Sequence, residues 1–396
     1  MSRTLKIRRG TTAQNNSFTG ALGELTMDTD KKEVRVHDGS TTGGFPIGEK
    51  TEHGPDRFLV AASKTTLTIK AGVRIQVGTM FFETESALTI TPASCLDTGS
   101  SLANGKDYYV YVATNDNATA SVVCSLSASA PAGYTAYRRI GGFHTLCVNV
   151  GTISGHTLTG FTAGSILPQS VWCLNHYPRC MPINNAAGMV YIQETDSWVD
   201  IYNTGSSGQS AYGATRANTL QHYQFEELLR QQGKTLLDDQ EFFVASQGSN
   251  QQTNVNGGAQ PSPDTTGGRS DTNSRRMISN YGCEEMCGLQ WQHLAGWSAA
   301  GGSGWNAQNG GQGQFYGSAM ILLAGGHWGN SSYCGSRSRN ANNSLSNANA
   351  NNGARGRIRV KGRSPCVETR LSRTSLLAVM PAKHKNGVMF GLVKTT

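Results

Sequence analysis

The chain opens with short runs in which apolar and polar residues alternate, the pattern of strands that bury one face. Alternation covers residues 25–28 and 34–36, and the turn-prone residues 28–32 separate the two runs. So few short strands over residues 5–48 cannot enclose a core alone, because an isolated hairpin is only marginally stable in water. Oligomerisation would remedy this, and three copies wrapped around a common axis would let each strand face find a partner.

The same period of two continues from about residue 58 to residue 165. Strands are expected at residues 67–69, 73–77, 88–90 and 109–112, with Gly, Asn and Asp turns between them. Short strands at regular spacing are typical of a sandwich or a small barrel. We therefore expect a second, entirely β region after the first.

Helical periodicity first appears near residue 220 and predicts two short helices. The first would stop at Gly233, and its shared face would carry Leu220, Tyr223, Leu228 and Leu229. The second would begin at Asp238 or Asp239 and stop at Gly248, burying Phe242 or Phe243 and Ala245. Two helices among strands predict an α+β domain from about residue 171.

Residues 249–274 contain almost no apolar side chains and predict a long loop. Four of the six tryptophans follow within 38 residues, at positions 291, 297, 305 and 328. Large aromatic side chains supply core area where regular elements are short, so we interpret these tryptophans as core residues. A sugar-stacking platform is the alternative.

An asparagine-rich segment is the clearest functional candidate. Between Asn340 and Asn352, seven of thirteen positions are Asn. Taken alone, such a run is typical of a disordered polar loop. The apolar residues 320–323 lead directly into this region, however, and Gly-rich motifs bracket it. We therefore predict an ordered polar display loop fed by a buried strand.

Composition limits the class of protein. At 396 residues the chain is long enough for two to four domains. Charged residues make up only 15%, while 48 residues are Gly, which favours strands and ordered loops. No apolar run is long enough to span a membrane, and the first residues do not resemble a signal peptide. Synthesis in a cytoplasm, without membrane insertion, is the expectation.

The nine cysteines are scattered and include no C-x-x-C pair, which argues against a disulfide framework or a paired zinc site. Cys173, His176 and Cys180 could ligate a metal, but no fourth ligand is evident. We expect buried free thiols, no metal and no cofactor.

The net charge of +8 is concentrated at the C-terminal end. Residues 355–396 hold ten Lys or Arg and one acid, Glu368, so the rest of the chain is close to neutral. A basic tail on a neutral body argues against a nucleic-acid-binding protein. Apolar runs at 376–380 and 388–393 around a turn predict a hairpin there.

Motifs in a fixed order along the chain resemble the phage major tropism determinant family, over residues 5–356. The matching motifs are Arg9–Gln14, Phe18–Gly20, Val36–Gly39, Gly43–Pro46, Pro131–Thr135, Gly141–His144, Gly233–Leu236, Glu241–Phe242, Ala245, Trp291 and Gly325–Trp328. The resemblance implies a mixed β and α+β fold in an intertwined homotrimer. It implies an N-terminal β-prism for trimerisation and fibre attachment (1–48), a middle β-sandwich-like domain (49–170) and a C-type-lectin-like variable domain (171–360). The basic extension (361–396) lies beyond the resemblance.

In that family a retroelement rewrites adenine-containing codons near the end of the gene, so Asn codons mark variable positions. Carried onto this chain, the resemblance implies these variable receptor-binding positions: His327, Gly329, Ser331, Tyr333, Asn340, Asn342, Asn343, Asn347, Asn349, Asn351 and Asn352. The fixed residues that hold them would be Trp291, Trp328, Gly335, Ser336, Arg337, Gly353 and Arg355. Exposed positions on such a fixed support tolerate substitution at little cost in stability.

The resemblance further implies a non-enzymatic adhesin at the distal tail fibre of a virion. Its partners would be a bacterial surface receptor (protein or glycan), its own copies and a tail-fibre shaft protein. Two alternatives stay open: a tail-fibre polysaccharide depolymerase and a calcium-dependent glycan lectin. A depolymerase needs paired carboxylates, and the neighbours Glu226–Glu227 and Glu284–Glu285 would not face each other on a helix. Formylglycine-generating chemistry needs a close cysteine partner, which Cys334 lacks.

Overall fold

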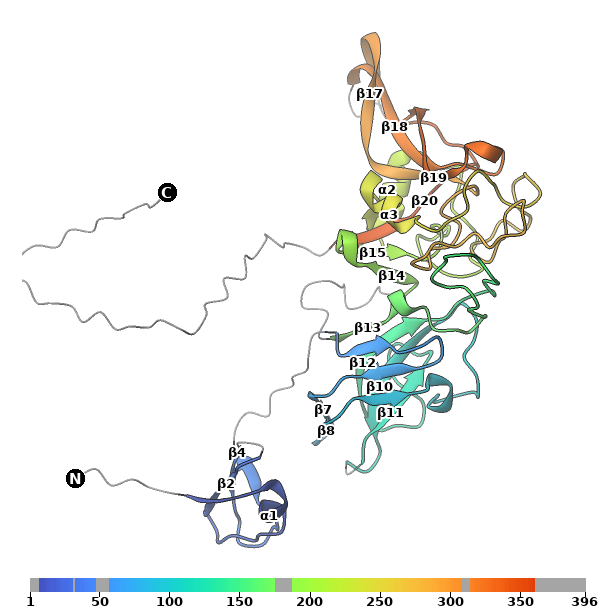
Figure 1. Cartoon of the computed structure of the whole chain (residues 1–396). Helices are drawn as coiled ribbons and strands as arrows, with labels where there is room; N and C mark the ends of the chain where they lie inside the picture. The colour runs from blue at the N-terminus through green and yellow to red at the C-terminus, as the bar shows by residue number, and fades with distance from the viewer. Residues whose placement is uncertain are drawn as a thin grey trace, which may run out of the picture. The chain divides into compact units, whose positions relative to one another are not determined.

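The computed structural model describes residues 7–30, 33–47, 57–117, 119–174, 187–307 and 314–359. Strands and irregular segments predominate over short helices within these ranges (Figure 1). The hairpin predicted within residues 361–396 lies outside the described residues. The mostly-β character expected from the alternating pattern is therefore confirmed for the described part of the chain.

The N-terminal region forms one sheet with strands in the order β1-β2-β3-β4. Its elements are β1 (Arg8–Gly10), α1 (Thr12–Asn16), β2 (Leu25–Asp28), β3 (Glu33–Val36) and β4 (Phe45–Ile47). The predicted strands at 25–28 and 34–36 are confirmed. The helix α1 was not expected; it begins at Thr11, whose hydroxyl and the Gln14 side chain form a reciprocal cap.

The buried face of this sheet is the polar one, a point that the alternating pattern left open. Thr26 and Asp28 are buried, whereas Leu25 is 37% exposed and Phe45 is 49% exposed. Buried polar contacts hold the interior: the Arg35 guanidinium lies 3.0 Å from the Asp28 carboxylate. Within the described residues 7–30 and 33–47, no hydrophobic side chain is buried. The apolar faces of these strands are therefore left open in a single chain.

The middle region packs two sheets and a hairpin around one apolar core. The strands are β5 (Leu59–Ala61), β6 (Leu67–Ile69), β7 (Val73–Val77), β8 (Met80–Thr84), β9 (Leu88–Ile90), β10 (Asp107–Thr114), β11 (Ser121–Ser125), β12 (Ala136–His144) and β13 (Trp172–Cys173). The strands predicted at 67–69, 73–77 and 88–90 agree to the residue, and 109–112 lies inside β10. Side chains of β5–β6 and of β10–β12 share the core, as in a sandwich.

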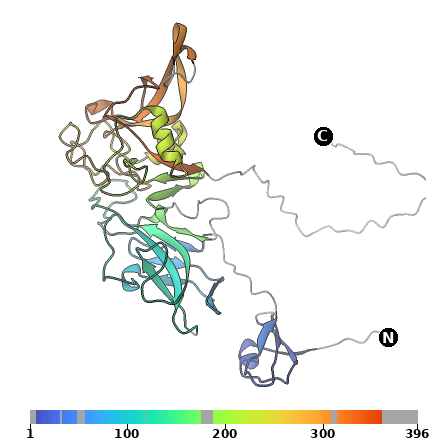
Figure 2. The ribbon, with the colours of Figure 1, turned by 180° about the vertical axis from the view of Figure 1, so that it is seen from behind.

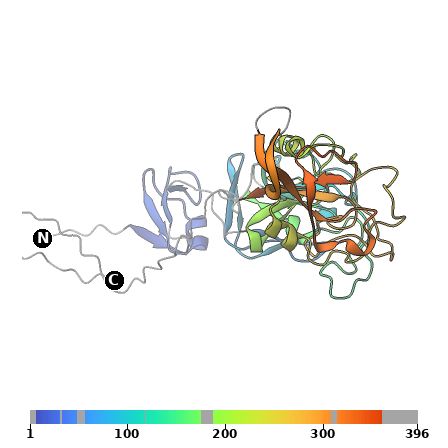
Figure 3. The same cartoon turned by 90° about the horizontal axis from the view of Figure 1, so that it is seen from above.

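The C-terminal region contains two further sheets, ordered β14-β15-β21-β16 and β19-β18-β17-β20. Their strands are β14 (Met189–Ile192), β15 (Ser197–Asp200), β16 (Thr235–Leu236), β17 (Trp291–Ala307), β18 (Gln314–Gly325), β19 (Gly335–Ser344), β20 (Asn352–Ala354) and β21 (Gly356–Arg359). The long β17–β18 hairpin projects from this region (Figure 1). Residues 249–274 form neither helix nor strand, as predicted, and lie to one side of that hairpin (Figure 3).

Two helices lie against the base of the hairpin (Figure 2): α2 (His222–Arg230) and α3 (Asp239–Ala245). The predicted start of α3 is confirmed, because the Asp238 carboxylate caps it by accepting from the Glu241 N–H. The predicted face of α2 is wrong in part. Tyr223 is 44% exposed, and the buried residues are His222, Phe225 and Leu229.

One apolar core spans the middle and C-terminal regions. Leu146 and Leu158, from the middle region, pack in the same cluster as Phe242 of α3 and Leu294 of β17. Because this core is continuous, the two regions should unfold together.

None of the helices in the described residues is both long and apolar enough to cross a membrane.

Replacing Leu146 with Ala should therefore destabilise both regions at once. Removing a fully buried leucine side chain costs about 2–5 kcal/mol, and Leu146 is 1% exposed. Thermal unfolding followed by near-ultraviolet circular dichroism should shift to lower temperature in a single transition. The matched control is Leu126→Ala at a 49% exposed position, which should leave the transition unchanged. Two separated transitions in Leu146→Ala would contradict the shared core.

Candidate functional site

The asparagine-rich segment begins as a strand rather than a loop. β19 pairs antiparallel with β18, with Asn340 opposite Leu323 and Asn343 opposite Ile321. The predicted loop at 340–344 is therefore wrong, because the backbone hydrogen bonds of β18 extend into this stretch. Only residues 345–351 connect β19 to β20 without strand structure. We call residues 327–352 the display segment.

Most predicted variable positions reach the surface. Gly329, Ser331, Tyr333, Asn342 and Asn349 are exposed, and His327, Asn340, Asn343, Asn347 and Asn351 are half-buried. Tyr333 is the most open of the large side chains here, at 77% exposure, and it ends a single turn of 3-10 helix (Ser331–Tyr333). Aromatic side chains of this kind supply much of the energy at protein interfaces.

Asn352 has to be removed from the predicted set of variable positions. Its side chain is 1% exposed. The residue lies in β20, which pairs in parallel with β17 and places Asn352 opposite Trp291. A side chain enclosed by this pairing cannot touch an external receptor, so Asn352 belongs with the supporting residues.

Several side chains of the display segment bond to their own neighbours. The Asn340 side-chain oxygen accepts from the Asn342 N–H at 2.8 Å. The Asn347 amide donates to the Asn343 side-chain oxygen at 2.5 Å. These bonds hold the asparagines in fixed positions, although a receptor would have to compete with them for the same groups.

Two of the predicted supporting residues, Trp291 and Trp328, pack against apolar side chains of the C-terminal region. Trp291 packs against Ile321 and Leu323, and the half-buried Trp328 packs against Val255, Met277 and Leu289. These contacts agree with the predicted core roles of Trp291 and Trp328. The structure does not describe the side chains of Trp297 and Trp305. Arg337 is exposed, with its guanidinium 5.2 Å from the centre of the Phe243 ring.

Close backbone approach explains the glycines among the supporting residues. A Cβ at Gly353 would lie 2.5 Å from the Gln290 side-chain oxygen. A Cβ at Gly335 would lie 2.6 Å from the corresponding oxygen of Gln251, which also accepts the Ser336 N–H at 3.1 Å. Near the end of the display segment, the Gln290 amide donates to the carbonyls of Ala350 and Asn352, and within the segment the Gln251 side-chain oxygen accepts from the Ser336 N–H.

Arg355 makes the densest set of polar contacts in this region. It is 1% exposed. Each of the five guanidinium N–H groups can be matched to an acceptor: Gln292 Oε1, Asp200 O, Ile201 O, Asn203 Oδ1 and Glu284 O. The guanidinium therefore joins β15, the segment after it and the segment before β17 to the end of the display segment.

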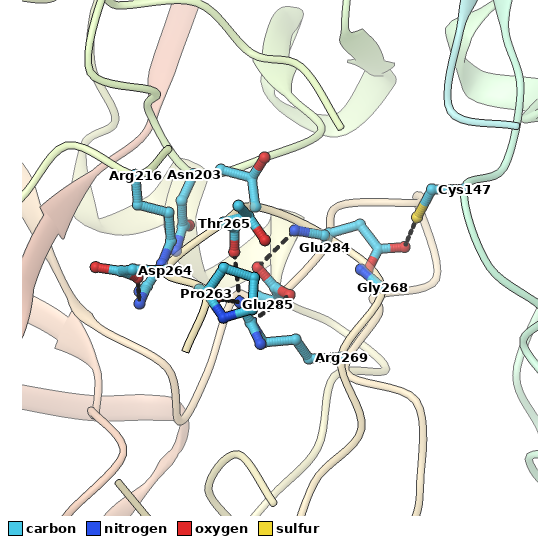
Figure 4. Close-up of polar contacts among 12 residues, drawn as sticks. Cys147, Asn203, Arg216, Pro263, Asp264, Thr265, Gly268, Arg269, Glu284 and Glu285 are labelled. Carbon is cyan, nitrogen blue, oxygen red and sulfur yellow. Dashed lines mark hydrogen bonds and ion pairs between the residues drawn. The ribbon is translucent and has the colours of Figure 1, made fainter. Parts of the chain in front are cut away.

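A second polar cluster surrounds Glu284 and Glu285 (Figure 4). Glu284 lies 2.6 Å from Arg276 and accepts from the Cys147 thiol at 3.3 Å. Glu285 lies 3.5 Å from Arg269. Burial, followed by the charge of Glu284, raises the pKa of Glu285. Both carboxylates are at most 1% exposed, so they cannot reach an external polysaccharide chain.

An imidazole pair links α2 to β17, and sequence reasoning missed it. The Nδ1 atoms of His222 and His293 are 3.0 Å apart. The helix end that carries His222 also holds the display segment, because the His222 and Thr219 N–H groups donate to the carbonyls of Leu345 and Asn349. Seventy-one residues separate the two histidines, so no local pattern could have joined them.

Six of the seven described cysteines are buried, as predicted, whereas Cys95 is half-buried. Cys95, Cys124, Cys147, Cys173, Cys283, Cys287 and Cys334 are free thiols. Burial raises the pKa of Cys334 to about 11, which suppresses its reactive thiolate. Among the described residues, no group of three or more His, Cys, Asp or Glu side chains could hold a metal ion. His176 and Cys180 lie outside the described residues.

Comparisons with known proteins agree over most of the chain. Residues 5–41 match the major tropism determinant N-terminal domain, and residues 57–173 match the Mtd second domain. The tail fiber receptor-binding protein of Bordetella phage BPP-1 is 31% identical over 376 residues, covering 85% of this chain and 93% of that protein. The solved U1 and I1 variants of the major tropism determinant are 29% identical, with a TM-score of 0.66 over 90% of this chain and 99% of theirs.

Replacing Arg355 with Met should strongly destabilise the chain, because it leaves buried acceptors without partners. Removing one member of a buried charged network costs about 3–5 kcal/mol. Urea denaturation measures this loss in free energy of unfolding. Arg230→Met, at a side chain that is 77% exposed, is the control and should change stability by under about 0.5 kcal/mol. Equal losses in both variants would contradict the assigned role.

The histidine pair predicts acid sensitivity. Burial lowers the pKa of His293 from 6.5 to about 3, so the folded chain binds fewer protons than the unfolded chain between these values. Stability from this group is therefore lost as pH falls below 6.5, by about 2 kcal/mol at pH 5.

The measurement is denaturant unfolding at pH 7 and pH 5, for the chain and for His293→Gln. Glu285 acts with the opposite sign because burial raises its pKa, so the comparison uses the difference between the two proteins. The variant should lose less stability on acidification than the original chain. An identical loss in both would rule out His293 as the cause.

Proposed function

The chain belongs to the major tropism determinant family, and we infer that it is the receptor-binding protein of a phage tail fibre. The observation that carries this inference is the relative in Bordetella phage BPP-1, a tail fiber receptor-binding protein matched over 93% of its length. The chain acts as an adhesin: it recognises a bacterial surface receptor, protein or glycan, without chemical turnover. It is a component of the virion, and its place is the distal end of the tail fibre.

The display segment is the receptor-binding surface in this proposal. The supporting observation is that five of its variable positions are exposed and five are half-buried, while Trp291 and Arg355 are buried beside them. A retroelement that rewrites Asn codons would thus alter contacts without altering the fold. The variable positions in this proposal are those predicted from the sequence, with Asn352 removed. They lie in a C-type-lectin-like domain.

The N-terminal sheet supplies trimerisation and attachment to a shaft protein. Its exposed apolar side chains support this role: Leu22, Leu25, Phe45 and Ile47 are between 37% and 83% exposed. Three such sheets around an axis would cover these side chains as a β-prism. Trimers repeated on several fibres gain avidity of about 10²–10⁴-fold over one site.

Cell binding should depend on Tyr333 while stability does not. Tyr333→Ala should reduce binding of the purified chain to host cells by tenfold or more, because a loss of about 2 kcal/mol is usual for an interfacial aromatic residue. The control is Tyr137→Ala in the middle region, at 41% exposure. Undiminished binding by Tyr333→Ala would exclude this residue from the receptor contact.

Monovalent affinity should be weak, because Tyr333 is the one large aromatic residue among the predicted variable positions. The dissociation constant of a single site for its receptor should be about 1 μM or weaker. Surface plasmon resonance with receptor in solution and sparse immobilised protein measures it. Submicromolar binding by one site would contradict this expectation.

Mass measurement by light scattering should show a trimer in solution. Phe45→Ser should shift the mass toward that of a monomer, because it removes an apolar side chain from the proposed interface. Leu126→Ser, at an equally exposed position, is the matched control and should leave the mass unchanged. A monomeric original chain would disprove the trimer.

A further inference from the structure

A cavity lined by residues outside the display segment lies where the middle and C-terminal regions meet. Its volume is about 350 Å³, within the range of small-ligand sites. One wall comes from residues 157–158 and the 3-10 turn Pro168–Ser170. The other wall comes from Glu194, Gln247 and residues 280–281. No position of the display segment contributes to it.

The two walls are joined by contacts that fix the shape of the cavity. The Thr157 N–H donates to the Asn280 side-chain oxygen at 3.3 Å. The Asn280 N–H in turn donates to the Gln247 carbonyl at 2.8 Å. Leu158, one of the lining residues, is 3% exposed and packs in the shared apolar core. The cavity is therefore formed before any ligand arrives, which reduces the entropy cost of binding.

The lining combines apolar surfaces with unused hydrogen-bonding groups. Tyr281, Pro168 and Leu158 supply the apolar part. The side-chain amides of Gln169, which is half-buried, and of Gln247, which is exposed, have no hydrogen-bond partner among the described residues, and each can both donate and accept. Paired donors and acceptors beside an aromatic ring match a sugar ring, which has C–H faces and hydroxyl edges.

The charge of the residues that line the cavity limits which sugars it would bind. Glu194 is the only charged residue among those that line the cavity, and Lys, Arg and His are absent from the described lining. Burial, followed by the interaction with the Glu194 carboxylate, raises the pKa of Tyr281 to about 12. An unbalanced carboxylate repels anionic sugars and favours neutral or amino-substituted ones.

We propose that this cavity is a saccharide-binding site for one neutral or amino-substituted pyranose. The ring stacks on Tyr281 and Pro168, and its hydroxyls pair with the amides of Gln169 and Gln247. Host surface polysaccharide as the source of the sugar rests on the proposed function, whereas the binding chemistry does not. In a trimer these sites would hold the particle near the cell surface while the display segment finds its receptor.

Saturation-transfer NMR on the full chain tests the proposal. The probes are glucose, galactose, glucosamine and N-acetylglucosamine, with glucuronate as the anionic comparison. At least one neutral or amino sugar should receive saturation, with a dissociation constant of about 1 mM, and glucuronate should receive less. No transfer to any neutral or amino sugar, or stronger transfer to glucuronate, would overturn the proposal.

Variants assign the signal to the cavity. Gln247→Ala and Gln169→Ala should each weaken binding about tenfold, the loss that corresponds to 1.4 kcal/mol. Neither should change the unfolding temperature, because neither side chain makes a hydrogen bond in the described structure. Gln231→Ala, which removes an amide elsewhere on the surface, and Asn342→Ala, in the display segment, are matched controls. Saturation that survives both cavity variants, or that is lost equally in the controls, would place binding elsewhere.

The sugar-binding and cell-binding experiments together distinguish a failure of the cavity proposal from a failure of the proposed function. Soluble sugars bind independently of any host cell, whereas receptor recognition is measured on cells with Tyr333→Ala. Sugar binding without a Tyr333 effect would preserve the cavity and remove the display proposal. A Tyr333 effect without sugar binding would do the reverse.

Discussion

Burial of the Arg355 guanidinium is the constraint on which the display segment depends. The side chain follows Asn352 by three residues, yet its bonds reach carbonyls of Asp200, Ile201 and Glu284. A surface whose side chains can be exchanged must draw its stability from residues that are not exchanged. A planar cation with five donors meets that need, because it fixes several carbonyl groups at once and uses no exposed position.

Elsewhere in the C-terminal region, buried polar contacts likewise take the place of regular secondary structure. Residues 249–274 form neither helix nor strand, but Arg276 and Arg269 hold Glu284 and Glu285 in the interior. Buried ion pairs contribute little net stability against apolar packing. They do require one geometry, since any shift leaves a charge without a partner.

The two ends of the described chain show opposite arrangements of apolar surface. In the C-terminal region, Phe242 and Leu294 are buried within one chain. In the N-terminal sheet, Asp28 and Arg35 occupy the interior, while Phe45 and Ile47 face outward. A single chain thus buries the apolar core of its C-terminal region but leaves apolar side chains of its N-terminal sheet exposed.

Sequence alone determined the features that depend on neighbouring residues. Alternation located β7 and β9, and the Asp238 cap located the start of α3, because these signals act over a few residues. Tertiary structure decided the rest. Alternation predicted strands in the N-terminal region but could not tell which face is buried, and the burial of Asn352 depends on pairing with β17 across the chain. The His222–His293 contact and the cavity beside Tyr281 likewise join segments that are distant in sequence. Local sequence patterns do not indicate which distant segments will pack together.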